Sequence, residues 1–347
     1  MRKRVALSAS IAVLTALSLS GCGGSIASSL PKPPLRTATT SSSPIAAPYA
    51  CDTSGNLISA CKRLGDFSTL DPCSLISLGA LPADLVASPM ARDSLDDCAF
   101  HITAGADKDV ELEIGELATT GNPGSANYDA GAQELQPAGL ALEQGTVSQG
   151  QCDDALYFGG DLVDLEINVF ASEGNGDQAL CDAANEVGKA LGTVLASKVA
   201  MQHFTVPKNS IAKVKACGLI NGSQIAGNTV DGQPETPSGH SCWWLPDGAN
   251  LNVEYGVDLE IGNELDRQAA DSHTQIHGLD TYTLKYSDSS YARCEVDTYR
   301  LPWGSASSDL HEIASVWATD SPGQIDAACT AATQLANVVW PKLPPMS

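Results

Sequence analysis

The chain has 347 residues, and its 41 acidic side chains outnumber 19 basic ones, which gives a formal net charge of −22. This acidic excess excludes nucleic-acid binding and broad contact with an anionic lipid surface, because both need a basic face. The length is sufficient for two domains of ordinary size.

Residues 1–21 have the features of an export signal. Three basic residues follow the first methionine, and Val5–Leu19 is an apolar run too short to span a membrane comfortably. The run ends in Leu19-Ser20-Gly21-Cys22, which resembles the bacterial lipobox. That resemblance implies acylation of the Cys22 thiol and cleavage before this cysteine. The alternative is an ordinary secretory peptide in which the cysteine is incidental.

Residues 22–50 are rich in Gly, Ser, Thr, Ala and Pro and almost free of charge. Such a segment cannot bury enough apolar surface to fold, so we expect a flexible tether. No later stretch approaches the roughly 18 apolar residues of a transmembrane helix. The sequence therefore predicts a folded extracytoplasmic region that contacts the outer face of the cell membrane through a lipid anchor.

Eleven cysteines divide into Cys22, a pair formed by Cys51 and Cys61, and two sets of four. The gaps between consecutive members are 25, 54 and 29 residues in the first set and 25, 52 and 35 in the second. In an exported protein such cysteines indicate disulfides. The two sets are Cys73, Cys98, Cys152 and Cys181, and then Cys217, Cys242, Cys294 and Cys329.

Four cysteines allow three connectivities, and we expect neighbours in each set to pair. Each bridge would close a loop of 25 to 35 residues and would stabilise the fold by about 3 kcal/mol through the unfolded state. The expected bridges are Cys73–Cys98, Cys152–Cys181, Cys217–Cys242 and Cys294–Cys329, with Cys51–Cys61 as a small N-terminal link.

The two halves are similar beyond their cysteines. Val110, Leu112 and Ile114 alternate with polar residues, and residues 251–261 show the same period of two, which is typical of a strand with one buried face. Residues 161–170 align with residues 309–318 as a further strand. The sequence thus predicts two copies of one domain, over residues 51–203 and 204–347.

Each half ends in a segment with helical periodicity. In the second half, Ser321-Pro322-Gly323-Gln324 has the features of an N-cap, a first-turn proline and a capping-box glutamine, and Pro341 would end the helix. Cys181 and Cys329 near the helix starts could link helix to sheet. The predicted class is α+β, two tandem similar domains, each an antiparallel sheet packed against helices and carrying two disulfides.

Three elements resemble an actinobacterial exported lipoprotein family known as domain of unknown function 3558. They are the opening Asp71-Pro72-Cys73, an aromatic residue two places after the second cysteine, and a late Cys-x-Ala-Ala helix. The second copy lacks Asp-Pro before Cys217 but has Trp244 at the aromatic position. The resemblance implies location and architecture, and no catalytic residues.

All five tryptophans lie in the second half. Neighbouring strand residues point to opposite faces, so we expect Trp244 in the core and Trp243 on the other side. Trp243 could stack on a ligand or could pack beneath a loop. We name Trp243 and Trp303 as tentative ligand contacts.

His273 and His277 are four residues apart, as two metal ligands on a helix would be. Their surroundings look more like a polar loop that leads to a turn at Gly278, and no glutamate lies between them as in the zincin motif. We therefore predict no metal site and no cofactor. The sequence also has no nucleophile elbow, no P-loop and no dinucleotide-binding turn.

These observations favour a non-enzymatic ligand-binding or accessory lipoprotein of the cell envelope, with an unknown small ligand or an envelope protein as partner and with no catalytic residues. An envelope hydrolase that uses a carboxylate pair is the first alternative, since such enzymes need two acids in a cleft. A structural scaffold of the envelope is the second.

Overall fold

We analysed a computed structural model of the chain. It describes residues 58–75, 86–89, 94–103, 109–119, 133–135, 140–147, 150–158, 163–171, 178–197, 200–220, 230–232, 236–246, 253–263, 270–304 and 309–346. The predicted signal peptide, the tether, Cys22 and Cys51 lie outside these residues. Within the described residues, no helix combines the length and the apolar character that crossing a membrane requires.

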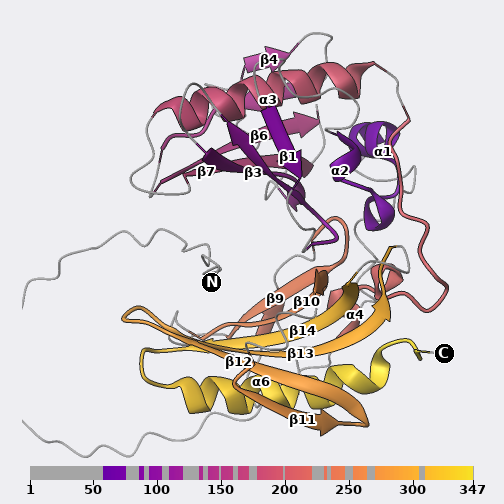
Figure 1. The fold of residues 1–347 in the computed structure, drawn as a ribbon, viewed down its shortest axis with the longest axis vertical. Helices are drawn as coiled ribbons and strands as arrows, with labels where there is room; N and C mark the ends of the chain where they lie inside the picture. The colour runs from indigo at the N-terminus through magenta and orange to yellow at the C-terminus, as the bar shows by residue number, and fades with distance from the viewer. Residues whose placement is uncertain are drawn as a thin grey trace, which may run out of the picture. The chain divides into compact units, whose positions relative to one another are not determined.

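The first half forms an antiparallel sheet with helices (Figure 1). Seven described strands follow the order β1-β2-β3-β7-β6-β5-β4. The strands are β1 (Val86–Pro89), β2 (Cys98–Thr103), β3 (Asp109–Thr119), β4 (Gln133–Leu135), β5 (Leu140–Glu143), β6 (Gln151–Phe158) and β7 (Val163–Ala171). The helices are α1 (Ile58–Leu64), η1 (Phe67–Thr69), α2 (Cys73–Leu75) and α3 (Gln178–Ala196).

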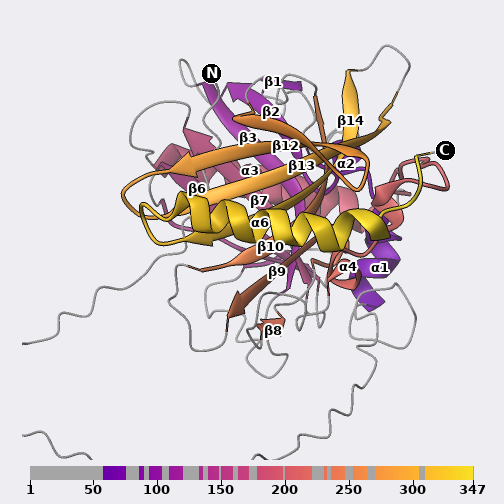
Figure 2. The same cartoon turned by 90° about the horizontal axis from the view of Figure 1, so that it is seen from below.

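The second half repeats this topology (Figure 2). Its described strands follow the order β11-β12-β13-β14-β10-β9-β8. Read from β8 to β11, this order matches that of the first sheet strand by strand, with β8 equivalent to β1 and β14 equivalent to β7. The strands are β8 (Val230–Gly232), β9 (Ser241–Pro246), β10 (Tyr255–Asn263), β11 (Ser272–Ile276), β12 (Leu279–Ser287), β13 (Ala292–Pro302) and β14 (Leu310–Asp320). The helices are η3 (Ile211–Lys213), α4 (Ala216–Leu219), α6 (Ile325–Val339) and η5 (Trp340–Lys342).

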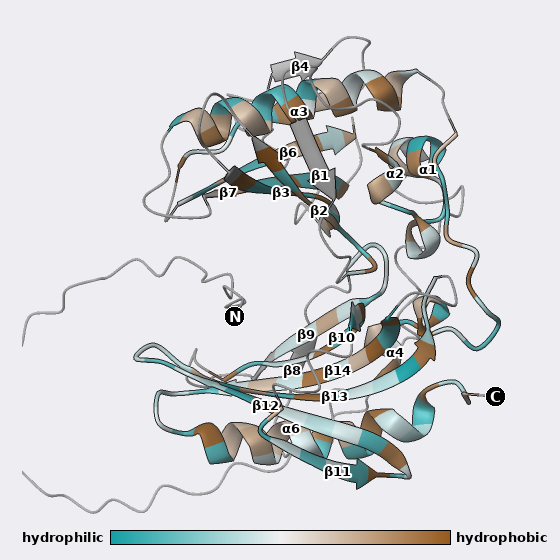
Figure 3. Cartoon of the chain, viewed as in Figure 1, coloured by the Kyte–Doolittle hydropathy of each residue, from teal (hydrophilic) through white to brown (hydrophobic). Residues whose placement is uncertain are grey.

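The predicted class and the predicted duplication are therefore confirmed. We call the two copies the first domain and the second domain. Each copy has its own apolar core, and the closing helices α3 and α6 show brown and teal residues on different sides (Figure 3). This amphipathic pattern lets each helix bury one side against its sheet.

All four bridges predicted within the sets of four are present: Cys73–Cys98, Cys152–Cys181, Cys217–Cys242 and Cys294–Cys329. In each domain one bridge links the short opening helix to the second strand, and the other links the sixth strand to the closing helix. Cys61 is disulfide-bonded as well. Disulfides of this number indicate an oxidising compartment, so the chain functions outside the cytoplasm.

The start of the last helix was predicted wrongly. The helix begins at Ile325, and its N-cap residue Gln324 makes no side-chain capping hydrogen bond. Residues 321–323 form a turn instead, with Gly323 at a φ of 81°. A left-handed glycine is incompatible with a helical turn at that position, so the capping signature in the sequence was outweighed by the turn.

Candidate functional site

The two tentative ligand contacts have different surroundings. Trp303 is only 9% exposed and packs edge to face against Phe204, at 5.1 Å between ring centroids, so its ring belongs to the core of the second domain. Trp243 is half-buried in β9, and its neighbour Trp244 is 4% exposed on the core side. The alternation expected for this tryptophan pair is therefore present.

The two closely spaced histidines lie on a hairpin rather than on a helix. His273 in β11 stacks on Tyr282 at 4.7 Å between centroids, and its Nε2 lies 3.2 Å from an Asp280 oxygen. His277 occupies the turn with a φ of 52°, and its Nε2 lies 3.1 Å from the Asn337 carbonyl. Across the described ranges, no group of three metal-ligating side chains is arranged to hold an ion.

The strongest candidate site is the face of the first sheet that points away from the Cys152–Cys181 bridge and α3. We call it the distal face. Register places Ala99, Glu113, Asn168 and Asp153 side by side on neighbouring strands, because directly paired residues point to the same side. The other members of this face are two residues away from this row on their strands: Glu111 on β3, Gln151 on β6, and Glu166 and Phe170 on β7. Asp164 lies a further two residues along β7 from Glu166.

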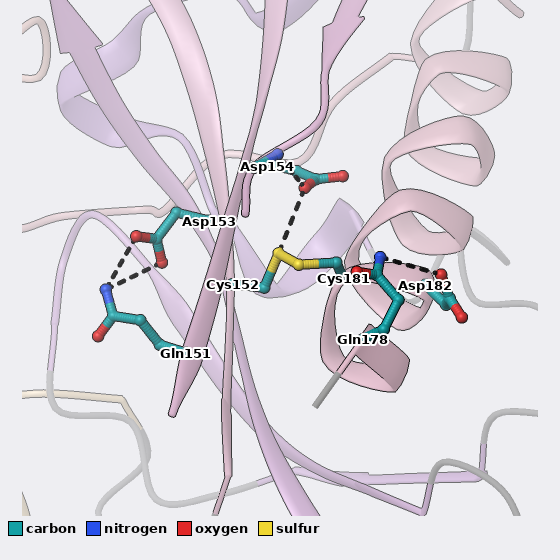
Figure 4. Close-up of a disulfide and its surroundings, with 8 residues drawn as sticks. Gln151, Cys152, Asp153, Asp154, Gln178, Cys181 and Asp182 are labelled. Atoms are coloured by element: carbon teal, nitrogen blue, oxygen red, sulfur yellow. Dashed lines mark hydrogen bonds between the residues drawn. A yellow bond between two sulfur atoms is a disulfide. The ribbon is translucent and has the colours of Figure 1, made fainter. Parts of the chain in front are cut away.

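Figure 4 shows Gln151 and Asp153 on the side of β6 away from the disulfide. The Gln151 amide nitrogen donates to both carboxylate oxygens of Asp153, at 3.1 and 2.8 Å. A neutral amide thus satisfies Asp153 without neutralising its charge. A similar pair, Gln178 and Asp182, lies on the exposed side of α3, with 3.5 Å between nitrogen and oxygen.

Two buried polar atoms of the distal face have no hydrogen-bond partner. They are Asp164 Oδ1 and Asn168 Oδ1, in side chains that are 7% and 6% exposed. Asn168 donates its amide to Glu166, which fixes its other end among the carboxylates. Leaving such acceptors unsatisfied is costly, so each of them calls for a functional or structural explanation.

The pKa shifts of these acids show that they are close to one another. Burial raises the pKa of Asp164 to about 7, with added repulsion from Glu166 and Glu143. Burial also raises the pKa of Glu166, against a hydrogen bond from Asn168, and repulsion from Asp153 adds to the rise. In the described part of the chain, Asp153, Asp164 and Glu166 form no ion pair with a basic side chain.

Glu116 extends this acidic group at the bulge in β3. Desolvation of its carboxyl and then repulsion from acidic neighbours raise its pKa, although the residue as a whole is exposed to solvent. The neighbours that repel it are Glu166, Asp97, Asp96 and Glu113. The distal face therefore presents several carboxylates that carry their negative charge at a cost.

The equivalent face of the second domain contains a basic side chain of its own. Arg293 precedes the third cysteine of its set, as Gln151 does, and its Nη2 lies 3.1 Å from Glu295 Oε2. Its guanidinium carbon lies 4.5 Å from the centre of the Trp317 ring. Trp317 in turn donates to Asp258 Oδ2 at 2.6 Å. One arginine thus interacts with a carboxylate and an aromatic ring at once.

Register makes the comparison between the two faces residue by residue. The first-domain row Ala99, Glu113, Asn168, Asp153 corresponds to Trp243, Gly256, Trp317, Glu295 in the second domain. Trp317 lies over Gly256, where an added Cβ would clash with its ring. In the first domain Asn168 replaces Trp317 and Gln151 replaces Arg293, while the larger Glu113 stands at the position of Gly256.

One contact joins equivalent positions of the two copies. Asp96 and His240 each stand two residues before the second cysteine of their set, and Asp96 Oδ1 lies 2.5 Å from His240 Nδ1. His240 Nε2 lies 3.0 Å from the Ala212 carbonyl. Both ring nitrogens therefore face acceptors, a pattern that only the imidazolium satisfies. Burial opposes this charge, but Asp96 raises the pKa of His240 overall. With no nitrogen left for a substrate, the pair is structural.

Sequence reasoning did not identify the acidic distal face. The alternation of Asp164, Glu166 and Asn168 along β7 and the position of Gln151 beside Cys152 were visible signals. These residues form one site only if β3, β6 and β7 are neighbours in the sheet, and the strand pairing was known only from the fold. No protein-family model, curated protein or solved structure matches this chain.

Proposed function

We propose that the protein is an exported, lipid-anchored binding protein of the cell envelope, not an enzyme, whose first domain engages a positively charged ligand or partner. The observation that carries this function is the distal face, where Asp153, Asp164 and Glu166 form no ion pair with a basic side chain of the described residues. Its counterpart in the second domain contains one.

Charge complementarity is the physical basis of the proposal. A cation that approaches the distal face gains the attraction of several carboxylates and relieves their mutual repulsion. It can also satisfy a buried acceptor, Asn168 Oδ1. The negative net charge of the whole chain would favour the encounter with a cationic ligand at low salt.

Binding of an arginine-rich peptide to the mature chain, against a glutamate-rich peptide of equal length, tests this function. We expect only the cationic peptide to bind, with an affinity that falls as salt rises. Replacing Asp153→Asn and Glu166→Gln together should weaken binding about tenfold or more. Replacing Asp182→Asn and Glu186→Gln removes the same charge from exposed positions of α3 and should change affinity little. Equal losses in both variants would mean that only net charge matters and would refute a specific face.

The lipid anchor is part of the proposal and rests on the lipobox-like Leu19-Ser20-Gly21-Cys22. Metabolic labelling with a fatty-acid analogue should mark the wild-type chain and leave a Cys22→Ala variant unlabelled. Two or more acyl chains would hold the protein stably at a membrane, whereas one would give marginal binding. Undiminished labelling of the variant would exclude this anchor.

A carboxylate-pair hydrolase is the second candidate, because one observation favours it. Asp164, with a pKa raised to about 7, can keep its proton near neutral pH beside Glu166, as a general acid must. Turnover of a panel of chromogenic glycosides that is lost in Asp164→Asn would support this enzyme and overturn the non-enzymatic assignment.

A further inference from the structure

The chain contains two copies of one sheet face, and one copy shows how the face accommodates a cation. In the second domain Arg293 lies before the third cysteine and pairs with the residue after it, Glu295. In the first domain the same two positions hold Gln151 and Asp153, which also contact each other. The backbone geometry for pairing these positions is therefore kept in both copies, and the cation is present in one.

We propose that the distal face of the first domain binds a guanidinium group of a ligand, at the place that the Arg293 side chain occupies in the second domain. This inference deepens the proposed function and rests on it. The bound group would lie against Asp153, Asn168 and Glu166, with Gln151 at its edge.

The acceptors on this face suit a guanidinium. Asn168 Oδ1 is buried without a partner, and the register sets Asn168 directly opposite Asp153. A planar group with five N–H donors can satisfy a carboxylate and an amide oxygen together, which a compact ammonium does less well.

Two side chains at the candidate site are smaller than their counterparts in the second domain. Asn168 stands where the second domain has Trp317, and Gln151 is shorter than Arg293. In the second domain the guanidinium lies 4.5 Å from the Trp317 ring centre, so an internal side chain already fills the corresponding place. A ligand is thus expected at the first copy and excluded from the second.

The distal face offers oxygen atoms to a metal ion as well, but its geometry argues against one. In the described portion of the chain, no three acidic, histidine or cysteine side chains converge as metal ligands. Asp153 is instead engaged by an amide donor, the Gln151 nitrogen, and an N–H donor from a ligand can take over that role. The site therefore favours an organic cation.

The test is calorimetric titration of the full mature chain with two guanidinium probes, agmatine and a short amidated peptide with a single arginine. Cadaverine (1,5-diaminopentane), which like agmatine carries two positive charges, and the matching lysine peptide serve as ammonium controls. Binding of agmatine would indicate a small-molecule source of the group. Binding of the arginine peptide alone would indicate a side chain of a partner protein. In both cases the guanidinium probe should bind at least about threefold more tightly than its ammonium control.

Gln151→Arg should fill the site from within and weaken binding of the guanidinium probes about tenfold or more. Gln178→Arg is the matched control, since it makes the same change beside another aspartate, on α3, and should leave binding unchanged. Gln151→Arg should also raise the melting temperature at pH 8, which shows that the variant is folded.

Unchanged affinity in Gln151→Arg would overturn the guanidinium site. In that case, weaker binding of the arginine-rich peptide by the Asp153→Asn, Glu166→Gln variant would still support the proposed function, although the guanidinium site would be refuted. Equal affinity for guanidinium and ammonium probes, or displacement of agmatine by micromolar Ca²⁺, would likewise overturn the inference. Absence of binding by every cationic probe would refute the site and the proposed function together.

Discussion

The two domains share strand order, disulfide positions and closing helices, but they differ in the charged side chains on the sheet face away from the closing helix. The second domain places Arg293 and Trp317 among its acids, whereas the first has Gln151 and Asn168 at these positions. The shared features involve the core, where packing constrains the residues of both copies. The difference lies on the face away from the closing helix, where the fold tolerates either charge pattern. A duplicated fold can therefore place a basic side chain among the acids of one copy and an amide at the equivalent position of the other.

Replacing Arg293→Gln should have the largest effect. The variant leaves Glu295 and Asp258 without their nearby cation in a largely buried setting, and breaking such a pair costs about 3 to 5 kcal/mol. Urea unfolding followed by tryptophan fluorescence measures this loss, because all five tryptophans lie in the second domain.

The control for Arg293→Gln is Gln151→Ala, which alters the equivalent position of the first domain. It should leave the fluorescence transition in place. A loss below about 1 kcal/mol for Arg293→Gln, the range of an exposed ion pair, would show that the internal cation is not what distinguishes the two copies.

Gly256→Ala should have an intermediate effect. An added Cβ would clash with the Trp317 ring, which is held by Asp258. Overpacking of this kind costs about 1 to 3 kcal/mol. The unfolding midpoint should fall, and tryptophan emission should shift as the ring moves. Gly218→Ala is the matched control, because its Cβ would find the nearest atom at 3.9 Å. An unchanged midpoint in Gly256→Ala would mean that Trp317 does not need the glycine.

Asp164→Asn should have the smallest effect on stability at acidic pH, and the effect should grow as pH rises. Its pKa is raised to about 7 in the folded chain, so between about pH 4 and pH 7 the folded state holds a proton that the unfolded state has lost. The free energy of unfolding contributed by this group therefore falls as pH rises through that window. The asparagine variant lacks this loss and should be more stable than wild type by up to about 4 kcal/mol at pH 8, with little difference at pH 4.

Circular dichroism during urea unfolding at the two pH values checks the Asp164 prediction. Asp182→Asn, an exposed acid on α3, serves as the control and should show the same small difference at both pH values. A larger stabilisation by Asp164→Asn at pH 4 than at pH 8 would contradict the sign worked out above.

Much of the fold was predictable because it depends on local and periodic signals. The alternation around Leu112 and in residues 251–261 indicated strands, and β3 and β10 contain these segments. Equal cysteine spacing predicted the bridges within each copy, since neighbouring cysteines close the shortest loops. The prediction that Ser321 caps the last helix was wrong, because the turn at Gly323 prevents the helix from beginning before Ile325.

The candidate site was less predictable, because it joins residues from β3, β6 and β7 that are far apart in the chain. Trp303 was chosen for its residue type, but tertiary packing against Phe204 placed it in the core. Asn168 and Gln151 drew no attention as single residues, because an amide becomes informative only when its neighbours are known.

The sequence by itself determined the duplication, the disulfide framework and the α+β class, because spacing and periodicity are properties of the chain alone. It also determined the acidic balance, which predicts that nucleic acid is not a partner. Only the tertiary structure decided that Asp153 lies opposite Asn168 while Glu295 lies opposite Trp317, since strand pairing brings distant residues together. The strand pairing shows that the acids of the second domain surround Arg293, whereas Asp153 of the first domain contacts the uncharged Gln151.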